Sequence, residues 1–508
     1  MTKCSKILRW AAAAALWANL GAHPIWAQDL SDVQIKQYDD GSVYEGTFRD
    51  GRQHGMGTYA LPNGYVYEGE WVDGRIEGTG RATYPNGSVY EGTFKDGKPE
   101  GGGKIAFGDG GIYEGEWSGG SMTGPGMARY ANGSVYTGSF KQGLHDGIGT
   151  FEEPSGYRYE GEWLGGKKEG RGKITYPDGA TYDGGFTSNQ REGTGRLTMP
   201  DGTTYDGAWA SGQINGSGTL TQPNGDVYVG TFKDGARDGT GKTTYKNADV
   251  FSGTFRADKR EGEGLFQAKD GTSYQGIWKA GRMAGMGRLT YADGSVFAGL
   301  FVADLPQGQG KITYPDGSTY EGAWVKGAIE GKGRATYVSG QIYEGSFKVA
   351  KPDGMGIMTY PDGYRYEGMW KSGTRDGNGV AQYPDGTLYN GGFKGGKRQG
   401  RGVMTEAGGF RYEGDWSAGE MEGQGMATYP SGDIYEGAFL KGKRHGAGKL
   451  TYKGGEVSEG LWENGILRAP LPAPLPAPLP APLPAPQAPA AGTAAPATQT
   501  APASESGG

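Results

Sequence analysis

The chain has 508 residues, of which 102 are glycine, and a formal net charge of −6. Hydrophobic residues make up only 35% while aromatic residues reach 12%, which excludes a large aliphatic core and requires aromatic rings packed on glycine-rich backbone. The glycines do not fall at every third position as in collagen, and the acidic balance disfavours a nucleic-acid partner.

Residues 1–27 have the pattern of a secretory signal: a basic start, an apolar stretch over residues 10–22 and a small-residue cleavage site ending at Ala27. The apolar stretch is too short to span a membrane, so a retained anchor is the less favoured alternative. We therefore expect an exported protein, periplasmic or secreted, that is cleaved near Ala27 and begins at Gln28. Cleavage removes Lys3, Lys6 and Arg9 and leaves 48 basic against 57 acidic residues, a net charge of −9.

After a lead-in over residues 28–37, the sequence repeats every 23 residues from residue 38 to residue 467. Each repeat has an anchor aromatic, counted here as position 0, a second large aromatic at position 4, and glycine at positions 2, 7, 11 and 13. A fixed short period predicts an array in which each repeat packs mainly on its neighbours. Eighteen full repeats precede a degenerate nineteenth that begins at Ser458, and their anchors are Tyr44, Tyr67, Tyr90, Tyr113, Tyr136, Tyr159, Tyr182, Tyr205, Tyr228, Phe251, Tyr274, Phe297, Tyr320, Tyr343, Tyr366, Tyr389, Tyr412 and Tyr435.

Each repeat is predicted to be a β-hairpin. Positions 0, 2 and 4 lie on one side of a strand because side chains alternate, and the second half of the repeat alternates in the same way. One turn is of the Asp-Gly type, with a left-handed backbone expected at position 7, and the other carries Pro-Asn-Gly or Pro-Asp-Gly. We predict an all-β fold: an elongated single-layer antiparallel sheet of stacked hairpins, in which each ring covers the glycine of a neighbouring repeat.

Position 4 alternates between phenylalanine and tryptophan, so the underlying unit is a pair of repeats. The alternation slips once, where Phe255 follows Phe232. Other irregularities gather at the slip, because Phe251 replaces the tyrosine anchor and Ala248 replaces a turn glycine. These departures predict a local weak point or bend around residues 228–255.

The motif Tyr-x-Gly-x-Trp/Phe, the further glycines and Tyr-Pro-x-Gly at this period resemble the MORN (membrane occupation and recognition nexus) repeat over about residues 38–465. The resemblance implies a sheet of hairpins with roles in protein scaffolding, homotypic assembly and, in some members, contact with anionic lipid. Members with kinase or methyltransferase activity carry a separate catalytic domain. Here the array takes up most of the chain, so we expect no enzyme. Assignment as a phosphatidylinositol-phosphate kinase would rest on repeat similarity alone.

Residues 468–508 form a low-complexity tail. Proline alternates with leucine or alanine from Pro470 to Pro486, which favours an extended polyproline helix. Beyond Gln487 the sequence is mainly alanine, proline, threonine and serine, and it is expected to be disordered. The tail is interpreted as a stiff spacer or, alternatively, as a ligand for an aromatic groove of a partner or of this sheet.

The sequence predicts no catalytic, cofactor-binding or metal-binding residue. Cys4, in the predicted signal, is the only cysteine, and His54, His145 and His445 are far apart and expected to be solvated turn residues. Carboxylates at position 1 share a face with Lys or Arg at position 14, which predicts cross-strand charge pairing. Calcium binding by these carboxylates is the less favoured alternative.

Two candidate binding surfaces remain. The rings of the first either pack on neighbouring glycines or bind sugar rings or extended peptides. The second is the turn edge at positions 8 and 9, whose cations either keep the protein soluble or contact anionic lipid or envelope polymer. The aromatic candidates are Tyr44, Trp71, Tyr90, Trp117, Tyr136, Trp163, Trp278, Trp324, Trp370 and Trp416. The basic candidates are Lys167, Lys168, Lys259, Arg260, Lys397, Arg398, Lys443 and Arg444.

These features predict a non-enzymatic exported repeat scaffold or protein-interaction module of the cell envelope. A protein that binds anionic lipid or envelope polysaccharide is the main alternative, and an enzyme would need a localised polar cluster. The expected partner is another protein or a second copy of this chain, with membrane lipid or envelope glycan as alternatives and no nucleic acid. Unpaired strands near residues 38–48 and 456–465 favour end-to-end pairing.

Overall fold

The structure is a computed structural model that describes residues 32–470, which form strands and turns and no α-helix. The predicted signal and the tail beyond Pro470 lie outside these residues. The chain divides into two compact units between Lys351 and Pro352. Between residues 32 and 470, no helix has the length and apolarity needed to cross a membrane.

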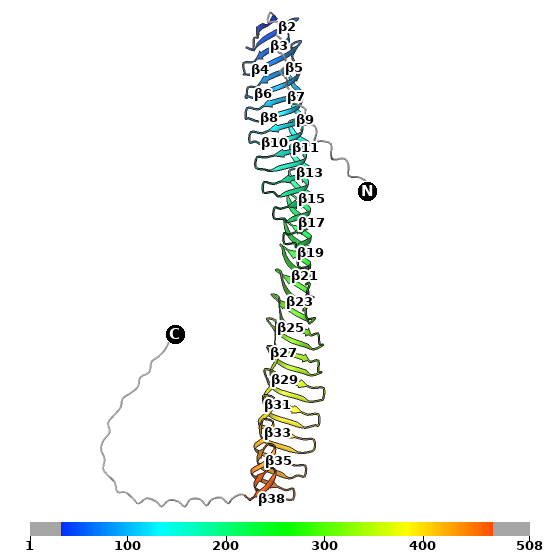
Figure 1. Ribbon diagram of the computed structural model, residues 1–508, viewed down its shortest axis with the longest axis vertical. Helices are drawn as coiled ribbons and strands as arrows, with labels where there is room; N and C mark the ends of the chain where they lie inside the picture. Colours follow the sequence, from blue (N-terminus) through cyan, green and yellow to red (C-terminus); the bar gives the residue numbers. More distant parts are fainter. Residues whose placement is uncertain (1–31, 471–508) are drawn as a thin grey trace, which may run out of the picture. The chain divides into compact units, whose positions relative to one another are not determined.

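In the first unit the strands follow one another in chain order (Figure 1). They are β1 (Gln34–Gln37), β2 (Val43–Arg49), β3 (Arg52–Ala60), β4 (Val66–Val72), β5 (Arg75–Thr83), β6 (Val89–Lys95), β7 (Lys98–Ala106), β8 (Ile112–Ser118), β9 (Ser121–Arg129), β10 (Val135–Lys141), β11 (Leu144–Glu152), β12 (Arg158–Leu164), β13 (Lys167–Thr175), β14 (Thr181–Thr187), β15 (Gln190–Thr198), β16 (Thr204–Ala210), β17 (Gln213–Thr221), β18 (Val227–Lys233), β19 (Ala236–Thr244), β20 (Val250–Arg256), β21 (Lys259–Gln267), β22 (Ser273–Lys279), β23 (Arg282–Thr290), β24 (Val296–Val302), β25 (Leu305–Thr313), β26 (Thr319–Val325), β27 (Ala328–Thr336) and β28 (Ile342–Lys348).

The second unit has the same build. Its strands are β29 (Lys351–Thr359), β30 (Arg365–Lys371), β31 (Thr374–Gln382), β32 (Leu388–Lys394), β33 (Lys397–Thr405), β34 (Arg411–Ser417), β35 (Glu420–Thr428), β36 (Ile434–Leu440), β37 (Lys443–Thr451), β38 (Val457–Glu463) and β39 (Ile466–Ala469).

Each repeat forms one hairpin, made of a seven-residue strand and a nine-residue strand such as β2 and β3. Within each unit every strand pairs antiparallel with the next along the chain, both inside a hairpin and between hairpins, as β2 does with β3 and β3 with β4. The predicted all-β fold, an open single-layer antiparallel sheet of hairpins, is confirmed.

The two-residue turn of each hairpin lies at positions 6 and 7. Asp50 and Gly51 have φ angles of 51° and 73°, the pair of left-handed residues that a type I′ turn requires. The expected left-handed backbone at position 7 is found even where glycine is replaced, with φ of 73° at Asn189 and 58° at Ala350. The sequence analysis did not anticipate a left-handed position 6, which even Val349 adopts at a φ of 47°. This conformation is costly for a β-branched residue.

The glycine at position 11 forms a β-bulge. The register between β2 and β3 shifts between Gly46 and Phe48, and Gly55 on the opposite strand has a φ of 81°. Glycine tolerates this left-handed conformation because it has no Cβ. Positions 9 and 13 both face the side that carries the aromatic rings, since Gln53 pairs with Phe48 and Gly57 pairs with Gly46.

The core of each repeat is its anchor ring lying on two bare glycines. Gly46 and Gly57 face each other across β2 and β3, and a Cβ on either would overlap the Tyr44 ring or hydroxyl. Tyr44 is fully buried, and its hydroxyl donates to the carbonyl of Thr47 at 3.0 Å. The expectation that this ring covers a neighbouring repeat is therefore wrong, because it covers the glycine pair of its own hairpin.

The position 4 ring makes the connection between repeats. Trp71 Nε1 donates to the carbonyl of Gly57 in the preceding repeat at 3.2 Å, and its ring packs edge-on against Tyr44 with centroids 5.2 Å apart. Every tryptophan of the array makes the same hydrogen bond. Edge-to-face ring pairs of this kind add to the free energy of burial.

Strand pairing runs unbroken through the slip in the alternation, but hydrogen bonds are missing there. Phe232 and Phe255 follow each other, so two successive repeats lack the indole bond, and the Phe251 anchor has no hydroxyl to donate. Thr243 Oγ1 is buried without a hydrogen-bond partner. These losses support the predicted weak point, whereas the bend stays a prediction.

Replacing Gly103 with alanine should strongly destabilise the repeat around it, because the added Cβ would overlap the Tyr90 ring and hydroxyl. Gly102→Ala is the matched control, since a Cβ on the neighbouring residue meets nothing within 4 Å. Hydrogen exchange of the β6–β8 amides measures the difference. We expect a loss of about 2 kcal/mol or more for Gly103→Ala and under about 1 kcal/mol for Gly102→Ala. Equal losses would contradict the packing described here.

Phe251→Tyr should strengthen the slip region by about 1 kcal/mol, because the new hydroxyl can donate to the Thr254 carbonyl. All sixteen tyrosine anchors make this bond to the residue three positions on. Tyr228→Phe in the preceding repeat is the reciprocal control and should cost a similar amount. Slower exchange of the β20 and β21 amides in Phe251→Tyr is the expected result, and unchanged exchange would count against it.

Candidate functional site

The ten predicted aromatic candidates lie in the core. The tyrosines Tyr44, Tyr90 and Tyr136 are 0% exposed, and the seven tryptophans are between 3% and 7% exposed. Neighbouring rings and the glycine backbone cover them. Of the two alternatives for these rings, packing on glycine backbone and neighbouring rings describes them, and they do not offer a flat platform to a sugar or a peptide.

The predicted basic edge is split between the two faces of the sheet. Side chains alternate along a strand, so the first member of each pair points away from the rings and the second points toward them. Lys167, Lys259, Lys397 and Lys443 are exposed, whereas Lys168, Arg260, Arg398 and Arg444 lie half-buried against rings. The eight cations therefore do not form one continuous edge.

The inward cations at position 9 stack on aromatic rings. The Arg398 guanidinium lies 4.1 Å from the Trp416 ring centroid in the next repeat and donates to the Gly419 carbonyl at 2.8 Å. Arg444 repeats this arrangement over Trp462 at 4.3 Å. Burial lowers the pKa of Lys168. These contacts use the cations to join successive repeats.

Position 9 side chains also bridge the face that carries the anchor rings, which we call the ring face. Lys168 lies 5.3 Å from the Tyr159 ring centroid and donates to the Tyr157 hydroxyl on the other side of that ring. Such a bridge covers the anchor ring from solvent. Bridges of this kind join Gln53 to Tyr38, His145 to Tyr130, Lys168 to Tyr157, Arg260 to Tyr245 and Arg375 to Tyr364.

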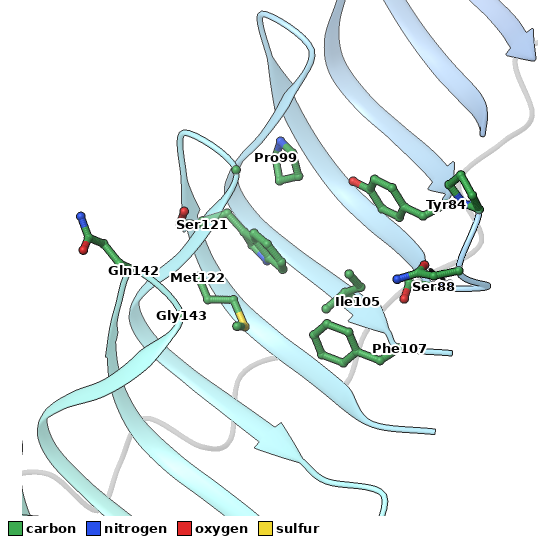
Figure 2. A pocket seen from close by; sticks show the side chains of 13 residues that line it. Tyr84, Ser88, Pro99, Ile105, Phe107, Ser121, Met122, Gln142 and Gly143 are labelled. Atoms are coloured by element: carbon green, nitrogen blue, oxygen red, sulfur yellow. Dashed lines mark hydrogen bonds between the residues drawn. The ribbon is translucent and has the colours of Figure 1, made fainter. Parts of the chain in front are cut away.

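In other repeats position 9 carries a side chain that cannot make such a bridge. Pro99 and Met122 occupy this position in two successive repeats, and a cavity of about 660 Å³ lies beside them. Figure 2 shows Tyr84, Ile105 and Phe107 projecting toward the same space from neighbouring strands and turns. We call this cavity, which Trp117 also lines, the uncharged pocket.

The lining of the uncharged pocket contains no Asp, Glu, Lys, Arg or His. Its polar groups are the side chains of Asn86, Ser88, Ser121 and Gln142 and the Tyr84 hydroxyl, whereas the Trp117 N–H donates to the Gly103 carbonyl. Three other cavities each include charged residues, among them Arg260, Arg444 and Lys242. Tyr84 and Phe107 are half-buried aromatic residues at position 17, and neither is among the aromatic candidates selected from the sequence.

The outer face carries the predicted cross-strand charge pairs. Arg81 Nε lies 3.1 Å from Glu91 Oε1, and Arg334 Nε lies 2.8 Å from Glu344 Oε1, in each case joining position 14 to position 1 of the next repeat. The pairing is confirmed at these sites. Because both partners are exposed, each pair contributes little to stability.

Side chains at position 10 cap the turn of the next repeat. Glu77 Oε2 accepts from the Asp96 N–H at 2.9 Å, and Glu169 accepts from the Ser188 N–H at 2.9 Å. His54 Nδ1 accepts from the Asp73 N–H in the same way at 3.4 Å. The expectation of a simply solvated residue is therefore wrong for His54, whose acceptor nitrogen faces the turn of the next repeat.

His145 is also not a solvated turn residue. Its ring stacks on Tyr136 with centroids 3.6 Å apart, and its Nε2 lies 2.7 Å from the Tyr130 hydroxyl. Trp163 packs edge-on against it at 4.8 Å. Burial lowers the pKa of His145 to about 4. Among residues 32–470, no group of three or more His, Cys, Asp or Glu side chains is arranged to hold a metal ion.

The repeat that contains His145 should weaken in acid. A pKa lowered from 6.5 to about 4 means that the unfolded state binds more protons between these values. The stabilisation is therefore complete above the unfolded pKa and is lost as pH falls toward 4. Hydrogen-exchange protection of β10–β12 should drop several-fold between pH 7 and pH 4.5, and His145→Arg should abolish that drop. The same drop in both proteins would contradict this role for His145.

Comparison with known proteins identifies the repeat. The model of the MORN repeat matches eighteen times in succession, from residues 44–64 to residues 435–457. No curated protein matches the chain.

Solved structures show only low similarity. The TCP domain of SAS-4 from Drosophila melanogaster, solved with a proline-rich motif of Ana2, is 16% identical over 40% of this chain and 90% of its own, with a TM-score of 0.20. The TCP10 domain of CPAP from Danio rerio is 16% identical over 53% of this chain and 99% of its own, with a TM-score of 0.13. TM-scores this low carry no argument about the present fold or function. The family assignment rests on the repeat itself: the chain belongs to the MORN repeat family.

Proposed function

We propose that this protein is a non-enzymatic, exported scaffold of the cell envelope that holds protein partners, including other copies of itself, along its repeats. MORN repeats indicate a scaffold or a module that binds protein or lipid, and the matched repeats take up residues 44–457. The signal pattern over residues 1–27 supports export.

The observation that carries the proposal is the repetition of one packed unit with a variable position 9. Ring, glycine pair and turn recur every 23 residues, while position 9 is glutamine, isoleucine, proline, methionine, histidine, lysine or arginine. A constant scaffold thus presents different chemistry at successive places along one face. This is how repeat arrays generate extended binding surfaces.

Binding of anionic lipid is the second candidate, supported by the exposed lysines at position 8: Lys167, Lys259, Lys397 and Lys443. Contact with anionic lipid is salt-sensitive because it depends on these charges. The half-buried cations at position 9 contribute less, since rings and turn carbonyls occupy them.

Expression of the full chain with its own leader in a bacterial host tests export. Mass spectrometry of the envelope and secreted fractions should find a chain that begins at Gln28. A chain that keeps Met1 and stays inside the cell would contradict export.

Capture of cross-linked envelope proteins on the full chain, followed by identification of the joined peptides, tests scaffolding. We expect protein partners or second copies joined to the ring face. Salt-sensitive binding to anionic vesicles, lost when the four exposed lysines are changed to glutamine, with no protein partner captured, would instead favour lipid binding.

A further inference from the structure

We propose that the uncharged pocket binds the proline-rich segment, residues 470–486, of a second copy of this chain. The inference deepens the proposed function, because it names the segment and the surface through which copies would associate. It rests on three features: the chemistry of the pocket lining, the spacing of its rings and the composition of the segment.

The chemistry of the pocket matches that of the segment. Tyr84 and Phe107 supply accessible rings, while Pro99, Ile105, Met122 and the mostly buried Trp117 complete an apolar lining without any charged side chain. Residues 470–486 contain only proline, leucine and alanine and are equally uncharged. Aromatic-lined grooves accept proline-rich segments because the extended polyproline helix loses little conformational entropy on binding. A charged segment would lose its hydration here without gaining an ionic partner.

The polar groups of the pocket suit the backbone of such a segment. A polyproline helix makes no internal hydrogen bonds, so its carbonyls need donors. Gln142 and Asn86 carry amide donors, and the Tyr84 hydroxyl can donate as well. The proline nitrogens carry no N–H, so few donors of the segment are left to satisfy.

The spacing of the rings also fits. Tyr84 and Phe107 occupy position 17 of successive repeats, two strands apart, which corresponds to roughly 9.6 Å. A polyproline helix rises about 9.3 Å over three residues, so residues three apart present the same edge at nearly this interval. A segment that runs along the sheet would therefore place the same edge against both Tyr84 and Phe107.

The length of the segment favours a second copy as its source. In the first unit alone, β9 and β28 are separated by nineteen strand spacings, about 90 Å. Seventeen residues of polyproline helix span only about 53 Å. The segment is thus too short to run along the first unit from β28 to the pocket, whereas the segment of another molecule can enter the pocket directly.

Photo-crosslinking between two full-length chains tests the proposal. One isotopically heavy chain carries a benzophenone amino acid in place of Leu479, and it is mixed with an excess of light chain. We expect heavy-to-light cross-links onto peptides that contain residues 84–122. Heavy-to-heavy cross-links that persist under excess light chain would show that each chain binds its own segment and would overturn the second-copy source. Cross-links elsewhere, or none, would overturn the pocket.

A variant of the light chain is designed to fill the pocket without destabilising the fold. Pro99→Arg introduces at position 9 the residue that Arg398 and Arg444 already provide, and it should lower the cross-link yield about tenfold. Ile214→Arg, at the same position between repeats that carry Arg191 and Arg237, is the matched control and should leave the yield unchanged. An unchanged yield in Pro99→Arg would overturn the proposal.

Phe107→Ser provides a second variant that removes a ring from the pocket, with Tyr176→Ser as its control in a repeat outside the pocket. Circular dichroism of all variants checks that the sheet is retained.

If the full chain captures envelope partners while the segment does not bind in the pocket, only this inference fails. A chain that is not exported and captures no envelope protein would remove the proposed envelope scaffold and leave the cross-link result unaffected.

Discussion

The structure depends on the contact between each anchor ring and the two glycines beneath it. A single-layer sheet has no second layer to cover its apolar face, so its core must be built on the sheet itself. Here the ring covers bare backbone at positions 2 and 13, and its hydroxyl returns to the carbonyl at position 3, as in Tyr44 with Gly46, Gly57 and Thr47. A methyl group at either glycine would lift the ring off the strands.

From that contact the connection between repeats follows. Once the anchor ring is flat on its glycines, its edge is available to the position 4 ring of the next repeat, and the indole N–H reaches the carbonyl of the position 13 glycine. The position 9 side chain then lies over the ring, and the position 10 side chain caps the following turn. Each repeat is thus joined to the next by packing, cation–π contact and hydrogen bonding, which is the nearest-neighbour logic of repeat proteins.

Much of this architecture was readable from the sequence because glycine and aromatic residues at fixed spacing leave few alternatives. The hairpins, the turn at position 7 and the outer charge pairs were anticipated.

The bulge at Gly55 was not anticipated, because a glycine in a strand does not by itself reveal a register shift. Lys168 and Arg398 were assigned to a solvent-facing edge because they lie next to the turn, and their contacts with the rings were missed. Position 10 carries a side chain that can accept a hydrogen bond, glutamate in one repeat and histidine in another. This shared property could have indicated from the sequence that position 10 caps a turn. Pro99 and Met122 line the uncharged pocket, and their place in it is clear only once position 9 is known to face the rings.

The central claim is that anchor rings require bare backbone, and a double-mutant cycle between Tyr90 and Gly103 tests it most directly. Local stability is measured by hydrogen exchange for the native protein, Gly103→Ala, Tyr90→Leu and the double variant. If the ring is what excludes the methyl group, Gly103→Ala should cost much in the native background and little once Tyr90 is leucine, which leaves a coupling of about 1–3 kcal/mol. Additive losses would contradict the account, because the glycine would then be required for a reason other than the ring that covers it.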